Sequence, residues 1–224
     1  MRVKAAGIGP WDALIRSGKS VLPQPLPLIL GSDLSGEVDS VGAGVNELQV
    51  GDEVFGVTNE RFTGAYAEYA VAKAAMLAPK PKRLNHTHAA SVPVVAVTAW
   101  QMVFDLAQLS SGQAVLVHGG AGNVGGYAVQ LAKRAGAMVI ATASVENDSY
   151  VRRLGADGVI DYRARRFEER VKSIDAVLDT VGGETLDRSY GVLKRGGIIV
   201  SSAVQPSRKQ QSSTVCGPFS SSFR

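Results

Sequence analysis

The second half of the chain alternates short apolar runs with longer amphipathic stretches. Apolar runs of this length are typical of buried strands, and the stretches between them have the spacing of helices. Short apolar strands separated by helices require a parallel sheet covered on both faces. The pattern predicts a Rossmann-type, doubly wound α/β fold with five strands, where the full dinucleotide fold has six. Strands are expected at residues 114–118, 138–142, 159–161, 176–179 and 198–202, and helices at 124–134, 149–154, 167–171 and 184–193.

The first 88 residues have a different pattern, in which short extended runs alternate with glycine turns. Strands are expected at residues 37–41, 51–55 and 65–71, and the proline-rich segment 23–27 is expected to be a loop. Residues 89–109 are apolar enough to form one buried helix. We therefore expect a small β-rich domain over 1–88, a nucleotide-binding domain over 89–206, and a disordered or aberrant tail over 207–224, where the composition changes.

Composition and charge restrict the classes of function. The 224 residues are 45% hydrophobic and 20% charged, which suits a globular α/β protein. The net charge of +4 is spread along the chain, so nucleic-acid binding is not expected. Cys216 is the only cysteine, which excludes an intrachain disulfide and a cysteine-rich zinc site and favours a reducing compartment. The sequence contains neither a membrane-length apolar run nor a signal peptide, so we expect a soluble, cytoplasmic protein without membrane partners.

The strongest motif is a glycine-dense turn between an apolar strand and a helix. It contains Gly119, Gly122 and Gly125, with Asn123 and Val124 opening the helix. Free N–H groups and the positive end of a helix dipole bind a pyrophosphate, and glycines let the backbone approach it. The context predicts dinucleotide binding. The alternative is a tight turn selected for packing.

The end of the second strand of this domain indicates which dinucleotide binds. An acidic residue there would hold the ribose hydroxyls of NAD, but this chain has Thr142-Ala143-Ser144. Ser144 and Tyr162 can donate hydrogen bonds to an extra phosphate, and Arg163 or Arg165 can supply charge. Glu146 would oppose this if it pointed inward, and Tyr162 has the alternative of an ordinary strand-end residue. We expect NADP(H) rather than NAD(H).

Several motifs occur together in the order found in one family. The chain resembles the zinc-independent, quinone oxidoreductase-like branch of the medium-chain dehydrogenase/reductase superfamily from residue 3 to about residue 205. The resemblance implies a partial GroES-like N-terminal domain before the nucleotide-binding domain. The motifs are the residues 5–7 and 10–12, 31–36, 41–45, 51–54, 98–101, the glycine turn, 154–157 and 179–183.

The resemblance also implies the chemistry. In related alcohol dehydrogenases, three side chains hold a catalytic zinc ion. The resemblance places residues near Gly9 to Trp11, Ser32 and about Val94 at those three positions, so no zinc is expected. The three histidines, His86, His88 and His118, are interpreted as structural. The implied activity is NADPH-dependent hydride transfer to a quinone or α,β-unsaturated carbonyl compound without a metal. The alternative is a catalytically inactive NADP(H)-binding fragment of such an enzyme.

Site residues follow from the same resemblance. It places Thr98 beside the nicotinamide, the glycine-turn residues at the pyrophosphate, and Val181 and Gly182 along the cofactor. Trp11, Asp33 and Tyr66 would face the substrate with Gly9 and Ser32, although Trp11 has the alternative of packing at an exposed rim. Relatives carry asparagine where this chain has Gly9. Asp12 is expected to cap the helical turn that follows.

Both ends of the chain differ from the family pattern. Met1 corresponds to a point within an N-terminal strand, and the residues after 207 do not resemble a sixth strand in this reading frame. A frameshift in the coding sequence near residue 207 is one hypothesis. An edge strand at 198–202 without its neighbour would favour aggregation or pairing into a homodimer, so we expect poor stability without a partner. A monomer with a sharp cooperative melt would contradict this expectation.

Overall fold

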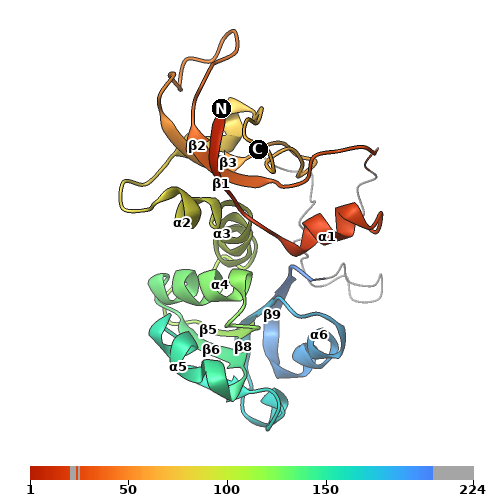
Figure 1. Cartoon of the computed structure of the whole chain (residues 1–224). Helices are drawn as coiled ribbons and strands as arrows, with labels where there is room; N and C mark the ends of the chain where they lie inside the picture. The colour runs from red at the N-terminus through yellow and green to blue at the C-terminus, as the bar shows by residue number, and fades with distance from the viewer. Residues whose placement is uncertain (21–23, 25, 204–224) are drawn as a thin grey trace. The chain divides into compact units, whose positions relative to one another are not determined.

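The chain divides into two compact units, Met1–Val94 and the residues from Val95 onward. The computed structural model describes residues 1–20, 24 and 26–203. The expected tail over 207–224 lies outside the described residues, as do Pro23 and Pro25 of the proline-rich loop 23–27, whereas residues 24, 26 and 27 are described and form neither helix nor strand. Each unit has its own sheet, as Figure 1 shows, and its own cluster of buried apolar side chains.

The first unit is built on an antiparallel sheet with the order β1-β2-β3-β4. Leu34 and Val54 are fully buried and anchor two small apolar clusters beside this sheet. Alternation of buried and partly exposed positions along β3 is what a sheet covered on one face requires. The elements are β1 (Arg2–Ala6), α1 (Pro10–Arg16), β2 (Asp33–Glu37), β3 (Glu53–Val57), the short 3₁₀ turn η1 (Ala74–Met76), β4 (Leu77–Pro79) and α2 (His86–Ala90).

Two expectations for this unit were wrong in detail. A strand was expected at 37–41, where polar and apolar residues alternate, but the observed strand β2 lies earlier and ends at Glu37. The strand expected at 65–71 is replaced by turns and one isolated bridge, from Arg2 to Tyr69. Its backbone bonds to several partners, including Leu30 and Met1, so it does not form one continuous ladder.

The second unit is a five-stranded parallel sheet with the order β7-β6-β5-β8-β9. The order starts in the middle at β5, extends outward to β7, and then reverses to β8 and β9. This reversal creates a switch point between β5 and β8 at the carboxyl ends of the strands. The strands are β5 (Ala114–His118), β6 (Met138–Ala143), β7 (Gly158–Asp161), β8 (Ile174–Asp179) and β9 (Leu193–Ser201).

Helices cover both faces of this sheet, as the apolar pattern predicts. Val115 and Val117 of β5 belong to one core cluster, whereas Leu116 between them belongs to the other. The first cluster includes residues of α4 (Asn123–Arg134) and α5 (Asp148–Arg153), and the second includes Leu186 of α6 (Gly183–Ser189). Figure 1 shows α4 and α5 on one side of the strands and α6 on the other. The predicted α/β fold, with a second antiparallel sheet at the N-terminus, is confirmed.

Three expected helices differ from the structure. The single helix expected at 89–109 is interrupted before Pro93, because proline lacks an N–H and disfavours a helical residue before it. The chain forms α2, then α3 (Pro93–Trp100), and then η2 (Gln101–Leu106), a π-helical segment. The helix expected at 167–171 is only a 3₁₀ turn, η4 (Phe167–Glu169). A second 3₁₀ turn, η5 (Tyr190–Val192), takes the end of the helix expected at 184–193, and β9 is longer than expected. The remaining 3₁₀ turn is η3 (Val145–Asn147).

Among the helices of the described chain, none combines the length and the apolar character needed to span a membrane.

Candidate cofactor-binding site

The glycine turn joins the carboxyl end of β5 to the first residue of α4. Gly119 has a φ of +72°, a conformation that L side chains rarely adopt. A Cβ atom on Gly125 would lie 2.1 Å from the carbonyl oxygen of Gly119, and one on Gly120 would lie 2.8 Å from Cβ of Ala141. The protein's own packing therefore requires these glycines, so their spacing alone does not demonstrate a ligand.

The amide groups at the start of α4 give a more direct indication of a ligand. Gly122 caps the helix without a side-chain hydrogen bond, and the amide of Gly126 makes the first bond of the helical type, 2.8 Å from the carbonyl oxygen of Gly122. The amides of Asn123, Val124 and Gly125 have no acceptor within the described residues. Three free donors at a helix N-terminus can bind an anion such as a pyrophosphate.

A cavity of about 560 Å³ opens beside this turn, within the second unit. Five of the predicted cofactor residues line it: Gly119, Gly122, Ser144, Tyr162 and Val181. Its other lining residues include four arginines, namely Arg163, Arg165 and Arg166 after β7 and Arg188 in α6. The volume suits a large polar ligand, and the arginines suit one that carries phosphate groups.

The arginines of the cavity differ in what they already bind. Arg163 forms an ion pair with Glu146, at 3.2 Å. Arg166 and Arg188 both pair with Glu168. Arg165 lines the cavity and makes no ion pair in the part of the chain that the structure describes. The guanidinium of Arg165 is therefore the one that a phosphate can take without displacing a carboxylate.

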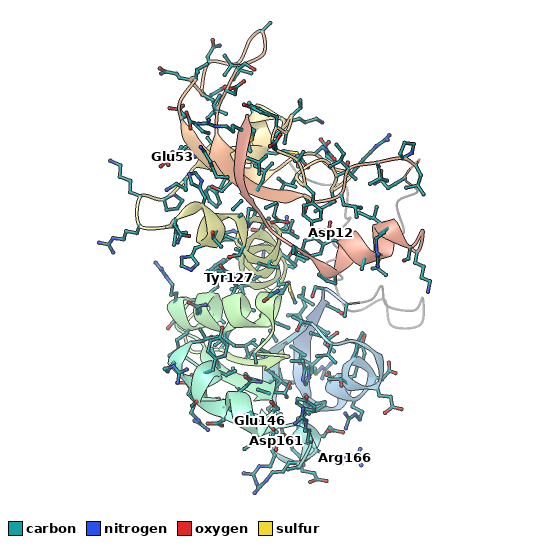
Figure 2. The ribbon with its side chains drawn as sticks, viewed as in Figure 1. Asp12, Glu53, Tyr127, Glu146, Asp161 and Arg166 are labelled. Atoms are coloured by element: carbon teal, nitrogen blue, oxygen red, sulfur yellow. The ribbon has the colours of Figure 1, made fainter. Side chains whose placement is uncertain are left out.

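Glu146 does not oppose a phosphate in the way that an inward acid would. Its side chain is 64% exposed and pairs with Arg163, and in Figure 2 it lies at the same end of the second unit as Asp161 and Arg166. Hydrogen bonding, first to Ser144 and then to its own backbone, lowers the pKa of Glu146 below its usual value. Ser144 is buried and accepts a hydrogen bond from the side chain of Asn147, 3.0 Å away.

Buried polar groups hold the two loops that border the cavity. Asp179, at the end of β8, is fully buried and accepts hydrogen bonds from the amides of Val181 and Gly182, each at 3.0 Å. The hydroxyl of Ser201 also donates to Asp179, at 2.7 Å. Gly182 is therefore held by Asp179, while the side chain of Val181 is 55% exposed and lines the cavity.

His118 lies directly behind the glycine turn and is fully buried. Its ring contacts the hydroxyls of Thr142 and Ser189, at 3.2 and 2.9 Å, and packs edge-on against Phe167. Burial is the main cause that lowers the pKa of His118 to about 4, so the ring is neutral at physiological pH.

The first unit brings most of the predicted substrate-side residues into one network. The indole N–H of Trp11 donates to the hydroxyl of Ser32 at 3.1 Å, and this hydroxyl donates to Asp33 at 2.7 Å. The other oxygen of Asp33 accepts from the amide of Val94, at 2.8 Å. Burial raises the pKa of Asp33, against the effect of these hydrogen bonds. Trp11 also packs edge-on against Phe62, so its packing role and its polar role coexist.

Tyr66 and Asp12 form a second pair in the same unit. The phenol of Tyr66 donates to Asp12 at 2.8 Å, and the amide of Gly9 donates to the same carboxylate oxygen at 2.8 Å. The second bond is the expected cap of α1. The other oxygen of Asp12 is buried and has no hydrogen-bond partner among the residues that the structure describes. Burial and the neighbouring carboxylates of Asp12 and Asp33 raise the pKa of Tyr66, so the phenol stays protonated.

The remaining predicted residue, Thr98, lies in α3 at the start of the second unit and is partly buried. Its place beside a nicotinamide stays a prediction. Other residues of the site were not predicted, and they include Asn147, Arg166, Arg188 and Asp179. Asp179 begins the motif 179–183, but Asn147, Arg166 and Arg188 are of residue types that are common at the surface, so no sequence signal separates these three from ordinary surface positions.

The histidines of the described residues do not converge on one point, and His86 and His118 are held by hydroxyl and carboxylate partners. The described residues contain no group of three histidine, cysteine or acidic side chains that could hold a metal ion. His86 instead contacts the hydroxyl of Ser35 and the carboxylate of Glu53, and His118 contacts two hydroxyls. The donors present therefore do not fit a zinc ion, which needs three or four converging ligands.

A parallel sheet with a switch point, free amides at a helix N-terminus and an arginine-lined cavity define a dinucleotide-binding protein of the Rossmann class. Comparisons with known proteins agree with this class. Residues 1–82 match the family model described as alcohol dehydrogenase GroES-like domain, and residues 123–221 match the one described as zinc-binding dehydrogenase. The chain belongs to the medium-chain dehydrogenase/reductase (alcohol dehydrogenase) superfamily, in its quinone oxidoreductase-like branch, and the predicted resemblance is confirmed.

Solved structures resemble the whole described chain. An alcohol dehydrogenase superfamily protein from Novosphingobium aromaticivorans is 40% identical with a TM-score of 0.88, over 96% of this chain and 69% of that one. The Escherichia coli quinone oxidoreductase, solved in complex with NADPH, is 30% identical with a TM-score of 0.85, over 97% and 71%.

Among curated proteins, the chloroplastic NADPH-dependent alkenal/one oxidoreductase of Arabidopsis thaliana is 37% identical over 209 residues, which are 89% of this chain and 53% of that protein. The chain spans about half the length of the curated relatives it matches.

Proposed function

We propose that the protein is an NADPH-dependent oxidoreductase that reduces a quinone or an α,β-unsaturated carbonyl compound without a metal. The observation that carries the proposal is the combination of three free amides at the start of α4 with an arginine-lined cavity beside them. The similar E. coli protein binds NADPH, and the similar Arabidopsis protein is named for its action on alkenals and enones.

The preference for NADPH over NADH rests on Arg165. The end of β6 carries Ala143 and Ser144 and no acid that would repel a 2′-phosphate. Arg165 lines the cavity without an ion-pair partner in the described chain, and Ser144 and Tyr162, which also line the cavity, supply hydroxyls. A charge-assisted bond from Arg165 to the phosphate would contribute about 1.5–3 kcal/mol, or at least a tenfold preference.

The bound cofactor would supply the hydride, and the chain would supply position and environment. The amides of Asn123, Val124 and Gly125 would bind the pyrophosphate, and Thr98 would lie beside the nicotinamide. On the substrate side, Trp11, Asp33 and Tyr66 would orient the carbonyl compound. Hydride addition to an enone carbon leaves an enolate, which takes its proton from water or from a neighbouring hydroxyl.

The first experiment measures cofactor affinity. NADPH and NADH are titrated into the wild-type chain, Arg165→Gln and Arg152→Gln, following the fluorescence of the reduced nicotinamide. Arg152 is a matched control, because it is paired with Asp148 in α5 and does not line the cavity. We expect Arg165→Gln to weaken NADPH binding at least tenfold and leave NADH binding unchanged, while Arg152→Gln changes neither. Equal loss of both cofactors in Arg165→Gln would contradict the assignment of the phosphate.

A second experiment tests turnover. The wild-type chain with NADPH is mixed with 1,4-naphthoquinone or 2-cyclohexenone, and the loss of NADPH absorbance is followed. Saturable oxidation would support the reductase. Selective binding without turnover would instead support the alternative of an inactive NADP(H)-binding fragment, since the cavity and the free amides all belong to the second unit. The cytoplasmic location, the homodimer and the absence of nucleic-acid binding stay predictions.

A further inference from the structure

A continuous chain of buried hydrogen bonds runs behind the glycine turn. The amide of Gly119 donates to the hydroxyl oxygen of Thr142 at 3.2 Å, and this hydroxyl lies 3.2 Å from Nδ1 of His118. On the other side of the ring, Nε2 of His118 lies 2.9 Å from the hydroxyl of Ser189, which lies 2.6 Å from the carbonyl oxygen of Thr185. Thr142, His118 and Ser189 are all buried.

The chemistry of the groups fixes the direction of each bond. The carbonyl of Thr185 can only accept, so the hydroxyl hydrogen of Ser189 points to it, and Ser189 must accept from Nε2–H of His118. The amide of Gly119 can only donate, so Thr142 accepts from it and gives its own hydrogen to Nδ1. An imidazolium would leave the hydroxyl hydrogen of Thr142 without an acceptor in the described chain. One proton arrangement therefore satisfies every group, and it contains neutral His118 with its proton on Nε2.

We propose that His118 is a positioning residue for the cofactor site, and that its neutral Nε2–H tautomer links the glycine turn to α6. This inference rests on the proposed function. Both ends of the hydrogen-bonded chain belong to elements that line the cavity, Gly119 in the turn and Thr185 in α6. Through Thr142 and Ser189, the imidazole sets the distance between these two walls.

The surroundings of His118 keep it neutral. Burial lowers its pKa to about 4, and Arg188 acts in the same direction, whereas Asp179 and Glu168 act against them. The ring of Phe167 packs against one edge of the imidazole, with ring centroids 4.6 Å apart. Above about pH 5, no change of charge is expected at this position.

A purely structural role would make a different prediction. A buried histidine that only fills space would affect stability when it is replaced, but its removal would change cofactor affinity no more than the removal of a similar histidine elsewhere. His86 provides that comparison, since its two ring nitrogens also contact a hydroxyl and a second side chain, in the first unit. His118→Phe keeps a ring of similar shape, and Thr142→Val removes the hydroxyl that receives the amide of Gly119.

The experiment has two parts. In the first, the wild-type chain with ¹⁵N-labelled histidine is observed by NMR between pH 5.5 and 8. We expect His118 to show one protonated nitrogen, Nε2, throughout this range. A Nδ1–H tautomer or an imidazolium at neutral pH would overturn the inference. This result does not depend on whether the protein binds a cofactor.

In the second part, NADP⁺ affinity is measured for variants shown by circular dichroism to be folded. We expect the affinity for NADP⁺ to fall about tenfold in His118→Phe and in Thr142→Val, with no further fall in the double variant. The affinity should be unchanged in His86→Phe. In His118→Asn the affinity should be partly recovered, because the amide oxygen of asparagine can accept a hydrogen bond from Thr142. Additive losses, or an equal loss in His86→Phe, would overturn the inference. A wild-type chain that bound no NADP⁺ would overturn the proposed function and leave the tautomer result standing. If His118→Phe did not fold, Thr142→Val and His118→Asn would carry the same comparison.

Discussion

Two neighbouring glycines of α4 offer a matched test of how the glycine turn is built. Gly125 and Gly126 are both near the start of the helix and both buried. A Cβ atom on Gly125 would lie 2.1 Å from the oxygen and 2.8 Å from the carbon of the Gly119 carbonyl, which are backbone atoms. A Cβ atom on Gly126 would lie 3.3 Å from the end of the Leu154 side chain, and at ordinary contact distances from the Gly120 carbonyl oxygen (3.7 Å) and the Tyr150 hydroxyl (3.8 Å). The same substitution, glycine to alanine, should therefore be costly at Gly125 and nearly neutral at Gly126.

The magnitudes follow from the contacts. Alanine has a higher helix propensity than glycine, by up to about 1 kcal/mol, and it lowers the conformational entropy of the unfolded chain. Both effects stabilise the two variants equally, so they cancel when the variants are compared. Overpacking against backbone costs about 1–3 kcal/mol, and here it also displaces Gly119, whose carbonyl accepts from the amide of Gly122 at 2.9 Å. We expect Gly125→Ala to be destabilised by about 2 kcal/mol and to bind NADPH at least tenfold more weakly. Gly126→Ala should stay within about 1 kcal/mol of the wild type.

Urea unfolding followed by far-UV circular dichroism gives the stabilities, and titration of NADPH gives the affinities. If Gly125→Ala unfolded at the same urea concentration as Gly126→Ala and bound NADPH as the wild type does, the close contact between position 125 and the Gly119 carbonyl would not matter for stability or binding. A loss of affinity in Gly126→Ala equal to that in Gly125→Ala would also refute a role for this contact, because the two glycines would then act through the helix and not through the turn.

Three other outcomes are expected. Glu146→Gln should strengthen NADPH binding by a few-fold at low salt, because it releases Arg163 and removes an exposed negative charge near the cavity. Titrations of NADPH at two salt concentrations measure this gain, and an equal gain at both concentrations would contradict the electrostatic cause. Tyr66→Phe should destabilise the chain by about 1–3 kcal/mol, because a carboxylate oxygen of Asp12 loses a hydrogen-bond donor. The affinity for NADPH should not change. Urea unfolding measures the first effect, and titration of NADPH measures the second. Hydrogen bonds from Lys194, and then from the amide of Ala114, lower the pKa of Asp175. The ionised carboxylate therefore adds to the free energy of unfolding above about pH 4, and this contribution is lost as the pH falls through the lowered pKa. Asp175→Asn should therefore flatten the loss of stability between pH 7 and pH 3, and an unchanged pH profile of urea midpoints would exclude this role.

The parts of the fold that the sequence predicted correctly are those set by local alternation. The five strands of the second unit were predicted because parallel strands buried on both faces are nearly continuous apolar runs. Helix ends were predicted less well, since Pro93 divides one apolar stretch and Gly183 begins a helix that ends before Tyr190. Segment 65–71 was predicted wrongly because its bonds go to several distant backbone groups, which no local pattern records.

The candidate site was predictable where it depends on consecutive residues. The turn from Gly119 to Gly125 combines its strand, glycines and helix within one short segment. The polar groups behind it were not predictable, because His118, Thr142 and Ser189 come from three separate elements that are adjacent only after the sheet has formed. That Arg165 has no ion-pair partner in the described part of the chain likewise depends on which carboxylates Arg163 and Arg188 have already bound.

The π-helical segment after α3 changes which side chains share a face of this helical stretch. The amide of Ala107 donates to the carbonyl of Met102, five residues back, at 3.0 Å. Such a turn contains one residue more than an α turn, so the side chains after it are rotated by roughly 100° relative to those before it. In the helical stretch from Pro93 to Leu106, the buried face before the π turn and the buried face after it therefore follow different registers, and no single 3.6-residue period describes both. Insertion or loss of one residue here would change the phase of the helix without interrupting it.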